Sequence, residues 1–470
     1  MQKGQRNKYL LKNTIIFSIG NFGTKFISFF LVPLYTNILS TSEYGTVDLI
    51  YTIGIVLIPF LTLNIAEAIL RFPLDEGAEK EKIMSIGLVF FLISVVASFF
   101  VFPIVSRIEK VSDYTIYIFL YVVTMSASQI FLGYVKGREL LFRYSLGNII
   151  QTLGIAVFNI LFLVVLGKGI EGYLTAYIMA NIVTAIYAFF AANIIQVIRN
   201  FQIDIVLAKK MIVYSVVLIP NSFMWWIMNS ADRIMVTAMA GVAVNGIYAV
   251  AYKIPTLLST FATIFNQAWS YSAIRESDSK DVEEYSNAIY DRLVSVVLVV
   301  AIGLLMVVKP IMKFYVGTEY YSAWNYVPYL MVGFVFMTLG SFVATSYTVH
   351  KDSVGFLLSG MMGAIANIVL NFIMIPFWDA SGAALATCVS YIIVFIYRVY
   401  NTKKYLEINI FVKRHICGFA LLIVTALTLY IDNFWGQVLL VLEFIISLVL
   451  FRDFIKAIWN MISMRGEKNE

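Results

Sequence analysis

The stretch TIIFSIGNFGTKFISFFLVP, residues 14–33, decides how this sequence is interpreted. It is long and apolar enough to cross a bilayer, and it carries Lys25 near its middle. A lysine at the centre of a bilayer costs roughly 2.5–3.5 kcal/mol on insertion scales. That cost is offset most easily where the ammonium faces a wet internal cavity and meets an anion. The stretch therefore predicts a membrane protein that handles a negatively charged compound.

Similar apolar stretches recur along the whole chain. Of its 470 residues, 60% are hydrophobic and only 13% are charged, whereas a soluble protein carries about 25% charged residues. No hydrophilic stretch is long enough to form a soluble domain. We predict an all-α polytopic membrane protein with fourteen transmembrane helices. Their approximate positions are 13–38, 44–70, 83–106, 114–135, 142–167, 171–198, 211–240, 243–272, 288–308, 324–348, 353–377, 381–400, 412–431 and 433–452.

Lysine and arginine placement predicts the orientation of these helices. With the N-terminus in the cytoplasm, the cytoplasmic loops and tails carry 26 of the 34 basic residues and the outer loops carry 5. The other three lie inside predicted spans. Because basic residues concentrate in cytoplasmic loops, both termini are expected in the cytoplasm.

Two halves of the sequence match weakly. EYGTVDLIY at 43–51 aligns with VNGIYAVAY at 244–252, and Asn159 followed by Gly172 aligns with Asn371 followed by Gly382. Six spans in each half give both copies the same orientation, which predicts a pseudo-two-fold axis along the membrane normal. The expected domains are an N-lobe at 1–205, a C-lobe at 206–408, and two appended helices with a cytoplasmic tail at 409–470.

The same segments resemble the Wzx-type polysaccharide flippases of the multidrug/oligosaccharidyl-lipid/polysaccharide exporter superfamily. The resemblance spans the whole chain and is most specific at PLYTNIL (33–39) with EYG (43–45), and at NIVLN (367–371) with GAALAT (382–387). It implies two six-helix lobes around a central cavity, in the plasma membrane of a bacterium. It also implies transport of an undecaprenyl-pyrophosphate-linked oligosaccharide from the inner to the outer leaflet by alternating access. A fourteen-helix count is similar to the lipid II flippases, in which the extra pair forms a groove for the lipid tail.

The first span presents polar residues along one helical face. Asn21, Lys25 and Ser28 follow helical spacing and form a stripe with a central cation, as the wall of a cavity requires. The alternative is a structural role, in which these residues join helices and Lys25 pairs with a carboxylate.

The seventh span carries a second polar group of residues. Asn229, Asp232 and Arg233 lie in its outer half. Asp232 and Arg233 are sequence neighbours about 100° apart on a helix, so they do not face each other. A structural ion pair to another span and a contact with substrate are both open for this pair.

Lys253 in the eighth span is the third intramembrane cation. It stands beside Pro255, which is expected to interrupt the helix, and Thr256 continues a polar face. In the two-lobe arrangement, Lys253 is predicted to converge with Lys25 and Arg233 on the pyrophosphate of the substrate, which rewards charge-assisted hydrogen bonds.

The second span adds acidic residues. Glu67 and Arg71 have the i, i+4 spacing of a structural ion pair, with a cytoplasmic gate as the alternative. Asp48, near the outer end, is expected to be solvated. Glu67 and Asp232 are the candidates for a titratable group that couples transport to H⁺ or Na⁺.

The sequence offers little for catalysis. It contains two cysteines and two histidines, with no spacing typical of a metal site, so no metal and no cofactor are expected. The loops are too short for the acids and bases that a membrane-embedded glycan-polymerising enzyme needs, so the protein is expected not to be an enzyme. A cation-coupled multidrug exporter of the same superfamily is the main alternative, although the first span carries a lysine and no acid. The expected partners are the lipid-linked glycan, the bilayer and polysaccharide polymerase machinery, and not nucleic acid.

Overall fold

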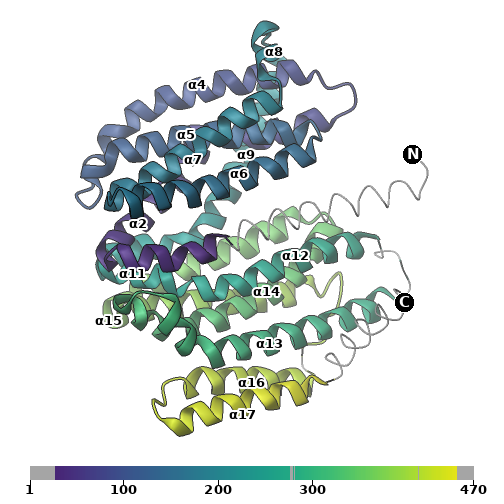
Figure 1. Cartoon of the computed structure of the whole chain (residues 1–470). Helices are drawn as coiled ribbons and strands as arrows, with labels where there is room; N and C mark the ends of the chain where they lie inside the picture. Colours follow the sequence, from purple (N-terminus) through teal and green to yellow (C-terminus); the bar gives the residue numbers. More distant parts are fainter. Residues whose placement is uncertain (1–26, 276–278, 280, 411, 453–470) are drawn as a thin grey trace, which may run out of the picture. The chain divides into compact units, whose positions relative to one another are not determined.

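The chain folds into helices. The computed structural model describes residues 27–275, 279, 281–410 and 412–452, and every regular element in them is helical, which confirms the predicted all-α fold class (Figure 1). The chain divides into two compact units, Met1–Thr237 and Ala238–Glu470. The lobe boundaries expected at residues 205 and 408 stay predictions.

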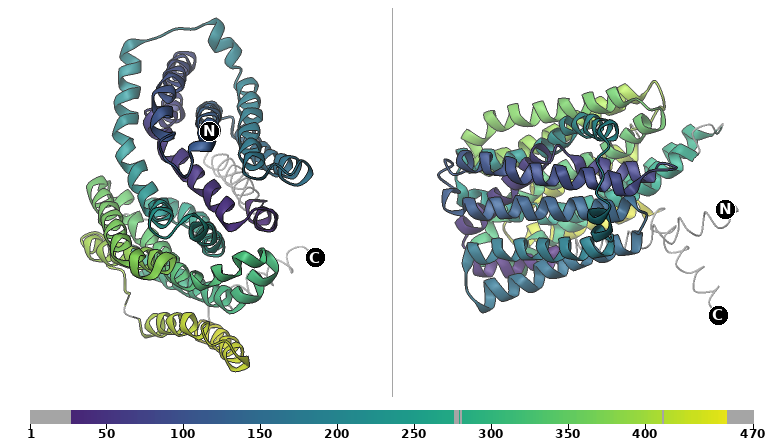
Figure 2. Two further views of the ribbon diagram at one scale, coloured as in Figure 1. Left: turned by 90° about the vertical axis from the view of Figure 1, so that its left-hand side faces the viewer. Right: turned by 90° about the horizontal axis from the view of Figure 1, so that it is seen from above.

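The first unit contains the described helices up to α10. After the apolar helix Ile27–Ile38 come α2 (Thr41–Leu61), α3 (Ile65–Arg71), η1 (Phe72–Leu74), α4 (Lys80–Val105), η2 (Ser112–Tyr114), α5 (Thr115–Gly137), α6 (Leu141–Asn159), η3 (Ile160–Val165), α7 (Gly169–Ala191), α8 (Ile194–Arg199), α9 (Ile205–Trp226), η4 (Ile227–Ala231) and α10 (Asp232–Met239). The long helices run side by side, as expected for membrane-spanning segments (Figure 2).

The second unit has fewer and longer elements. They are α11 (Val242–Ala251), α12 (Lys253–Arg275), α13 (Val282–Tyr315), η5 (Thr318–Asn325), α14 (Val327–Val349), α15 (Ser353–Thr402), α16 (Lys413–Thr428) and α17 (Phe434–Leu450). Helix α14 is mostly buried, and α12, α13 and α15 pack against it. The appended pair α16 and α17 packs on α13.

Nine helices in the described part of the chain are long and apolar enough to cross a membrane, or ten if the bent pair α11 and α12 forms one span. Helix α15 has non-helical backbone at Trp378 and Asp379, where two predicted spans meet in a kink. Shorter apolar helices cover Ile27–Ile38 and α17. The structure thus confirms a polytopic helical protein, while the count of fourteen spans stays a prediction.

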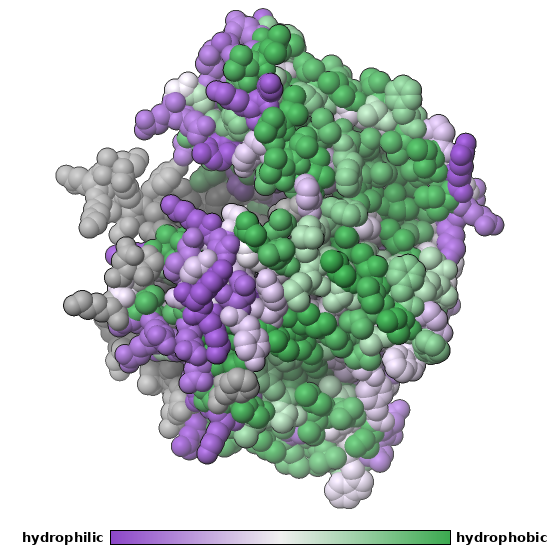
Figure 3. Space-filling model, turned by 180° about the vertical axis from the view of Figure 1, so that it is seen from behind, coloured by the Kyte–Doolittle hydropathy of each residue, from purple (hydrophilic) through white to green (hydrophobic). Residues whose placement is uncertain are grey.

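The exposed surface of each unit fits a bilayer. Helix α4 is strongly apolar and only a small share of its span is buried, and large side chains such as Leu92, Phe99 and Phe100 are exposed. In Figure 3 large parts of the visible surface are hydrophobic, and hydrophilic residues gather toward its edges. Since exposed apolar surface of this extent is unfavourable in water, these faces are expected to contact lipid.

The aligned segments of the two sequence halves have similar local structure. Gly45 is the fifth residue of α2 and Gly246 is the fifth residue of α11, and both are buried inside their own unit. Ser40 begins α2 with a capping box, in which its hydroxyl accepts from the Glu43 N–H and Glu43 accepts from the Ser40 N–H. The local match supports the internal repeat, and the two-fold relation between the halves stays a prediction.

The second pair of aligned glycines, Gly172 and Gly382, stands where a side chain would collide with the backbone. A Cβ added at Gly172 would lie 2.8 Å from the carbonyl oxygen of Phe162, and one at Gly382 would lie 2.4 Å from that of Met374. Each glycine thus follows a sharp turn and lets its helix approach the backbone about ten residues earlier in the chain.

Gly382→Ala is expected to lower the free energy of unfolding by about 3 kcal/mol, because a backbone carbonyl cannot move aside as a flexible side chain can. Gly360→Ala is the matched control on the same helix, since nothing lies within 4 Å of its added Cβ. Thermal unfolding of the detergent-solubilised variants checks the difference. Equal melting temperatures for the two variants would contradict the close approach at Gly382.

Candidate functional site

A buried ion pair joins two helices that lie far apart in the sequence. Arg233 in α10 donates from Nη1 to Oδ1 of Asp48 in α2 over 2.7 Å, and the two side chains are 15% and 8% exposed. The expectation that Asp48 is solvated is therefore wrong. Its carboxylate is buried because α10 supplies a guanidinium partner 185 residues later in the chain.

The helix that carries Arg233 changes its winding just before the ion pair. Residues Ile227–Ala231 form a π-helical turn between α9 and α10. On α9, the Trp226 indole N–H donates to the Thr52 carbonyl of α2 over 3.3 Å, one turn beyond Asp48. Two contacts therefore fix α9 and α10 against α2. Because π-helical turns occur frequently at functional sites, this segment is a candidate functional site.

Tyrosines gather beside the ion pair. We call the following residues of the first unit the tyrosine cluster: Tyr35, Tyr44, Tyr51, Tyr121, Tyr173 and Tyr177. Tyr51 lies on α2, three residues after Asp48, and its ring centroid is 6.4 Å from that of Tyr177. The Tyr173 hydroxyl donates to the Tyr177 hydroxyl over 3.1 Å. The cluster therefore places hydroxyl groups and aromatic rings next to a buried cation and anion.

The predicted cavity residues are divided between the two units and the residues outside the described ranges. Lys25 and Asn21 lie outside the described residues, and Ser28 is exposed on the helix Ile27–Ile38. Arg233 belongs to the first unit and Lys253 to the second. Their convergence on one anion stays a prediction.

Lys253 stands at the break between α11 and α12, which are bent by 43°. Pro255 is the third residue of α12, where a missing N–H is tolerated, so the break expected at this proline lies just before it. The Thr256 hydroxyl donates to the Lys253 carbonyl over 2.8 Å. In this structure the Thr256 hydroxyl therefore makes a hydrogen bond within the first turn of α12.

The other polar residues of the seventh span are within or beside the π-helical turn. Asn229 is half-buried in the turn. Asp232 is 2% exposed, and its Oδ1 accepts from the Arg233 backbone N–H over 2.9 Å. A carboxylate this deeply buried keeps Asp232 among the candidates for coupling.

The predicted pairing of Glu67 with Arg71 is replaced by another. Arg71 donates to Asp75 over 2.5 Å, and both of these side chains are more than half exposed. Glu67 is exposed one turn earlier on α3. The i, i+4 rule applies at Arg71, but the acidic partner follows the arginine in the chain.

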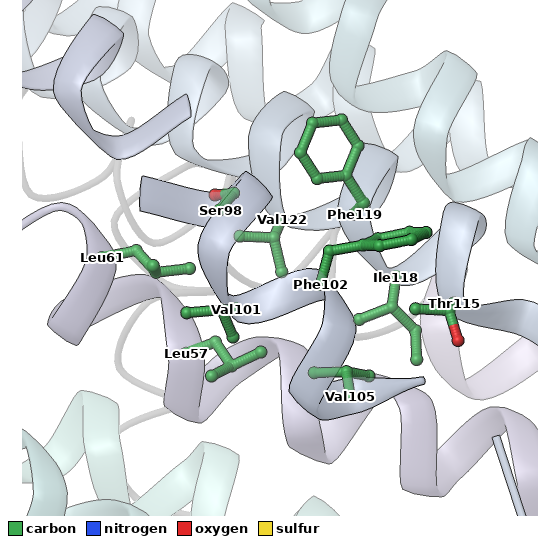
Figure 4. Close-up of a pocket in the computed structure, with 10 residues that line it drawn as sticks. All are labelled: Leu57, Leu61, Ser98, Val101, Phe102, Val105, Thr115, Ile118, Phe119 and Val122. Atoms are coloured by element: carbon green, nitrogen blue, oxygen red, sulfur yellow. The ribbon is translucent and has the colours of Figure 1, made fainter. Parts of the chain in front are cut away.

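An apolar pocket in the first unit does not suit an anionic headgroup. It lies between α2, α4 and α5, and eight of its ten lining side chains are apolar (Figure 4). The two hydroxyls in its lining, Ser98 and Thr115, donate to backbone carbonyls of neighbouring turns. In the described residues, no group of three or more His, Cys, Asp or Glu side chains has the geometry of a metal site.

Sequence reasoning missed Asp48 and the tyrosine cluster as parts of a site. A signal was present for Asp48, because an acid within a predicted span calls for a partner. No sequence signal identifies the cluster, since tyrosines at membrane interfaces are common.

Solved structures of transporters share the fold. The structure titled "Lipid II flippase MurJ, inward closed conformation" has a TM-score of 0.64 and 18% identity, and the match covers 94% of this chain and 100% of that one. An inward-facing multidrug resistance MATE family transporter of the MOP superfamily has a TM-score of 0.64 and 14% identity, over 83% of this chain and 95% of that one. A mutant form of the Vibrio cholerae MATE transporter VcmN has a TM-score of 0.55 and 10% identity, over 84% of this chain and 97% of that one.

The sequence itself matches one family. A comparison with curated protein sequences finds no match. Residues 10–271 match the family described as "Polysaccharide biosynthesis protein", and these residues are more than half of the chain. This stretch contains the ion pair, the π-helical turn and the tyrosine cluster. The chain belongs to the polysaccharide biosynthesis protein family.

Proposed function

We propose that the protein is a flippase that moves an undecaprenyl-pyrophosphate-linked oligosaccharide from the inner to the outer leaflet of the bacterial plasma membrane by alternating access. Membership of the polysaccharide biosynthesis family carries the proposal. Two observations support it: the fold shared with a lipid II flippase, and the apolar surface of both units. The solved structures named above are a flippase and transporters, in agreement with the expectation that the protein is not an enzyme.

In this proposal, Lys25, Arg233 and Lys253 hold the anionic headgroup in a cationic central cavity. Pyrophosphate carries at least two negative charges, and charge-assisted hydrogen bonds from lysine and arginine are roughly twice as strong as neutral ones. Asp48 neutralises Arg233 while the headgroup is absent, and the substrate competes with Asp48 for the guanidinium. Polar side chains at Asn21, Ser28, Asn229, Asp232 and Thr256 line the same path.

The energy source has two candidates in this proposal. Asp232 or Glu67 exchanges H⁺ or Na⁺ during transport, with Glu67 and Arg71 near the cytoplasmic gate. Alternatively, the membrane potential acts directly on charges in the cavity, at about 2.3 kcal/mol per charge per 100 mV. Polymerase machinery that receives the flipped glycan is the proposed protein partner.

A cation-coupled multidrug exporter is the second candidate, because solved MATE transporters share the fold. Purified protein in liposomes separates the two functions. A flippase exposes a fluorescent lipid-linked oligosaccharide to an impermeant quencher. It does not exchange a cationic dye for H⁺ or Na⁺ that flows down an imposed gradient. Dye transport without lipid movement would reject the flippase proposal in favour of the exporter.

We expect the loop after α8 to lie in the cytoplasm, in keeping with the basic residues at Arg199, Lys209 and Lys210. A reporter enzyme that is active only outside the inner membrane should therefore be inactive when fused after residue 205. Fusion after residue 168, in a predicted outer loop, is the positive control. Activity at 205 and not at 168 would reverse the proposed orientation.

A further inference from the structure

Glu443 is a buried carboxyl group in the middle of the apolar helix α17. It is the tenth of the 17 residues of α17, and its side chain is 6% exposed. The next residue, Phe444, packs against α13, where a Cβ added at Gly303 would lie 2.9 Å from the Phe444 ring. Glu443 therefore lies beside the apolar stretch of α13 that precedes Lys309, and its contact Thr428 is the last residue of α16.

The helices around Glu443 keep their charges at their ends. Helix α17 packs against α13 and α16. Helix α13 has no charged residue between Arg292 and Lys309, and α16 has none after His415. Three of the flanking basic residues have partners of their own: Lys309 pairs with Asp432, and Arg414 and His415 pair with Asp291. Among the described residues, no lysine, arginine or histidine side chain lies within ion-pair distance of Glu443.

The Thr428 hydroxyl lies within hydrogen-bond distance of two oxygens, one of which belongs to Glu443. Thr428 Oγ1 lies 2.7 Å from Glu443 Oε1 and 3.0 Å from the Val424 carbonyl oxygen. A hydroxyl has a single hydrogen, and a carbonyl can only accept. If the hydroxyl donates to Val424, the short contact with Glu443 needs a hydrogen from the carboxyl group. The other oxygen, Oε2, is buried with no hydrogen-bond partner among the described residues.

We propose that Glu443 is a proton-binding site that holds a neutral carboxylic acid at pH 7 and that hydrophobic carbodiimides modify. The acid donates from Oε1 to Thr428 Oγ1 and leaves Oε2 as a carbonyl oxygen. An ionised carboxylate buried here has no cation beside it in the described part of the chain and would carry a large desolvation cost. The neutral form removes the charge and keeps the hydrogen bond between α16 and α17.

The proposed modification needs the protonated acid. The carboxyl O–H adds across one C=N bond of dicyclohexylcarbodiimide: the proton goes to nitrogen and the carboxylate oxygen bonds to carbon. The acyl group then migrates to nitrogen and gives a stable N-acylurea, and no atom is lost. No oxidant or other co-reactant takes part.

The test treats membrane vesicles that contain the full chain with dicyclohexylcarbodiimide at pH 6, 7 and 8 and locates the label by mass spectrometry. At pH 7 an ordinary glutamate, with a pKa near 4.3, is protonated in only about one molecule in 500. We expect at least about 10-fold more label on Glu443 than on Asp432, which lies in the same tryptic peptide and is 87% exposed. Absence of label from Glu443 at pH 7 would overturn the proposal.

Glu443→Gln supplies a second measurement. Glutamine is neutral and has nearly the shape of the acid, so the variant should lose the label and keep the same melting temperature as the parent at pH 6 and at pH 8. Glu443→Ala removes the hydrogen bond and should melt at a lower temperature. A parent whose melting temperature differs from that of Glu443→Gln at pH 8 but not at pH 6 would show a charged carboxylate and contradict the assignment.

Discussion

Asp48→Ala is expected to lower the free energy of unfolding by about 3–5 kcal/mol, because it leaves the Arg233 guanidinium buried without its carboxylate. Arg233→Ala should have an effect of similar size, because it removes the guanidinium that contacts the buried Asp48 carboxylate. Replacing both residues with apolar ones, Asp48→Leu with Arg233→Met, should recover most of the lost stability, since neither charge is then buried. Thermal or denaturant unfolding of the parent, the two single variants and the double variant in detergent measures these differences.

An exposed pair in the same unit is the matched control. Arg71 and Asp75 have similar contact geometry but side chains that are 52% and 56% exposed. Arg71→Ala is therefore expected to change the free energy of unfolding by less than about 1 kcal/mol. If Asp48→Ala cost no more than this control, the buried ion pair would have no structural importance.

The double variant also separates structure from transport. If Arg233 serves only to join α10 to α2, the apolar pair should fold and move lipid-linked oligosaccharide normally. If the headgroup competes with Asp48 for Arg233, as proposed, the apolar pair should fold and transport poorly. Normal transport by a stable double variant would remove Arg233 from the site.

Sequence reasoning performed well on the helices. Apolar runs of sufficient length predict spanning helices because the backbone in lipid must satisfy its own hydrogen bonds. The kink of α15 at Trp378 and Asp379 lies in the gap between two predicted spans, and the bend between α11 and α12 lies close to Pro255. Aligned glycines at 172 and 382 proved to have the same close approach to backbone. These features are local, and local patterns suffice to predict them.

Pairing between distant residues could not be predicted in this way. The sequence leaves the partner of Arg233 open, and the position of Asp48 near the end of a predicted span suggests solvent, whereas the structure pairs the two. The sequence alone does not identify a contact for Glu443, whereas in the structure its side chain is 6% exposed and contacts Thr428 of the neighbouring helix. Which helix faces which is a tertiary property, and a single sequence does not encode it in any short window.

Lys25→Ala is expected to abolish polysaccharide export while the protein remains abundant in the membrane. Lys25 lies outside the described residues, so this prediction depends on the sequence argument that a lysine at mid-bilayer needs an anionic partner. Loss of one hydrogen bond to a charged group costs about 1.5–3 kcal/mol, or about 10- to 150-fold in affinity for the headgroup. Cell-surface polysaccharide measures export, and immunoblotting of membranes measures abundance.

Two further variants decide what Lys25 contributes. Lys25→Arg keeps the charge and should retain partial export, whereas a loss equal to that of alanine would show that shape matters more than charge. Lys12→Ala removes a positive charge from the cytoplasmic end of the same span and should leave export unchanged. Normal export by Lys25→Ala would exclude Lys25 from the site. The unfavourable insertion of a lysine at mid-bilayer would then contribute nothing to transport. The anion-binding proposal would have to rest on Arg233 and Lys253 alone.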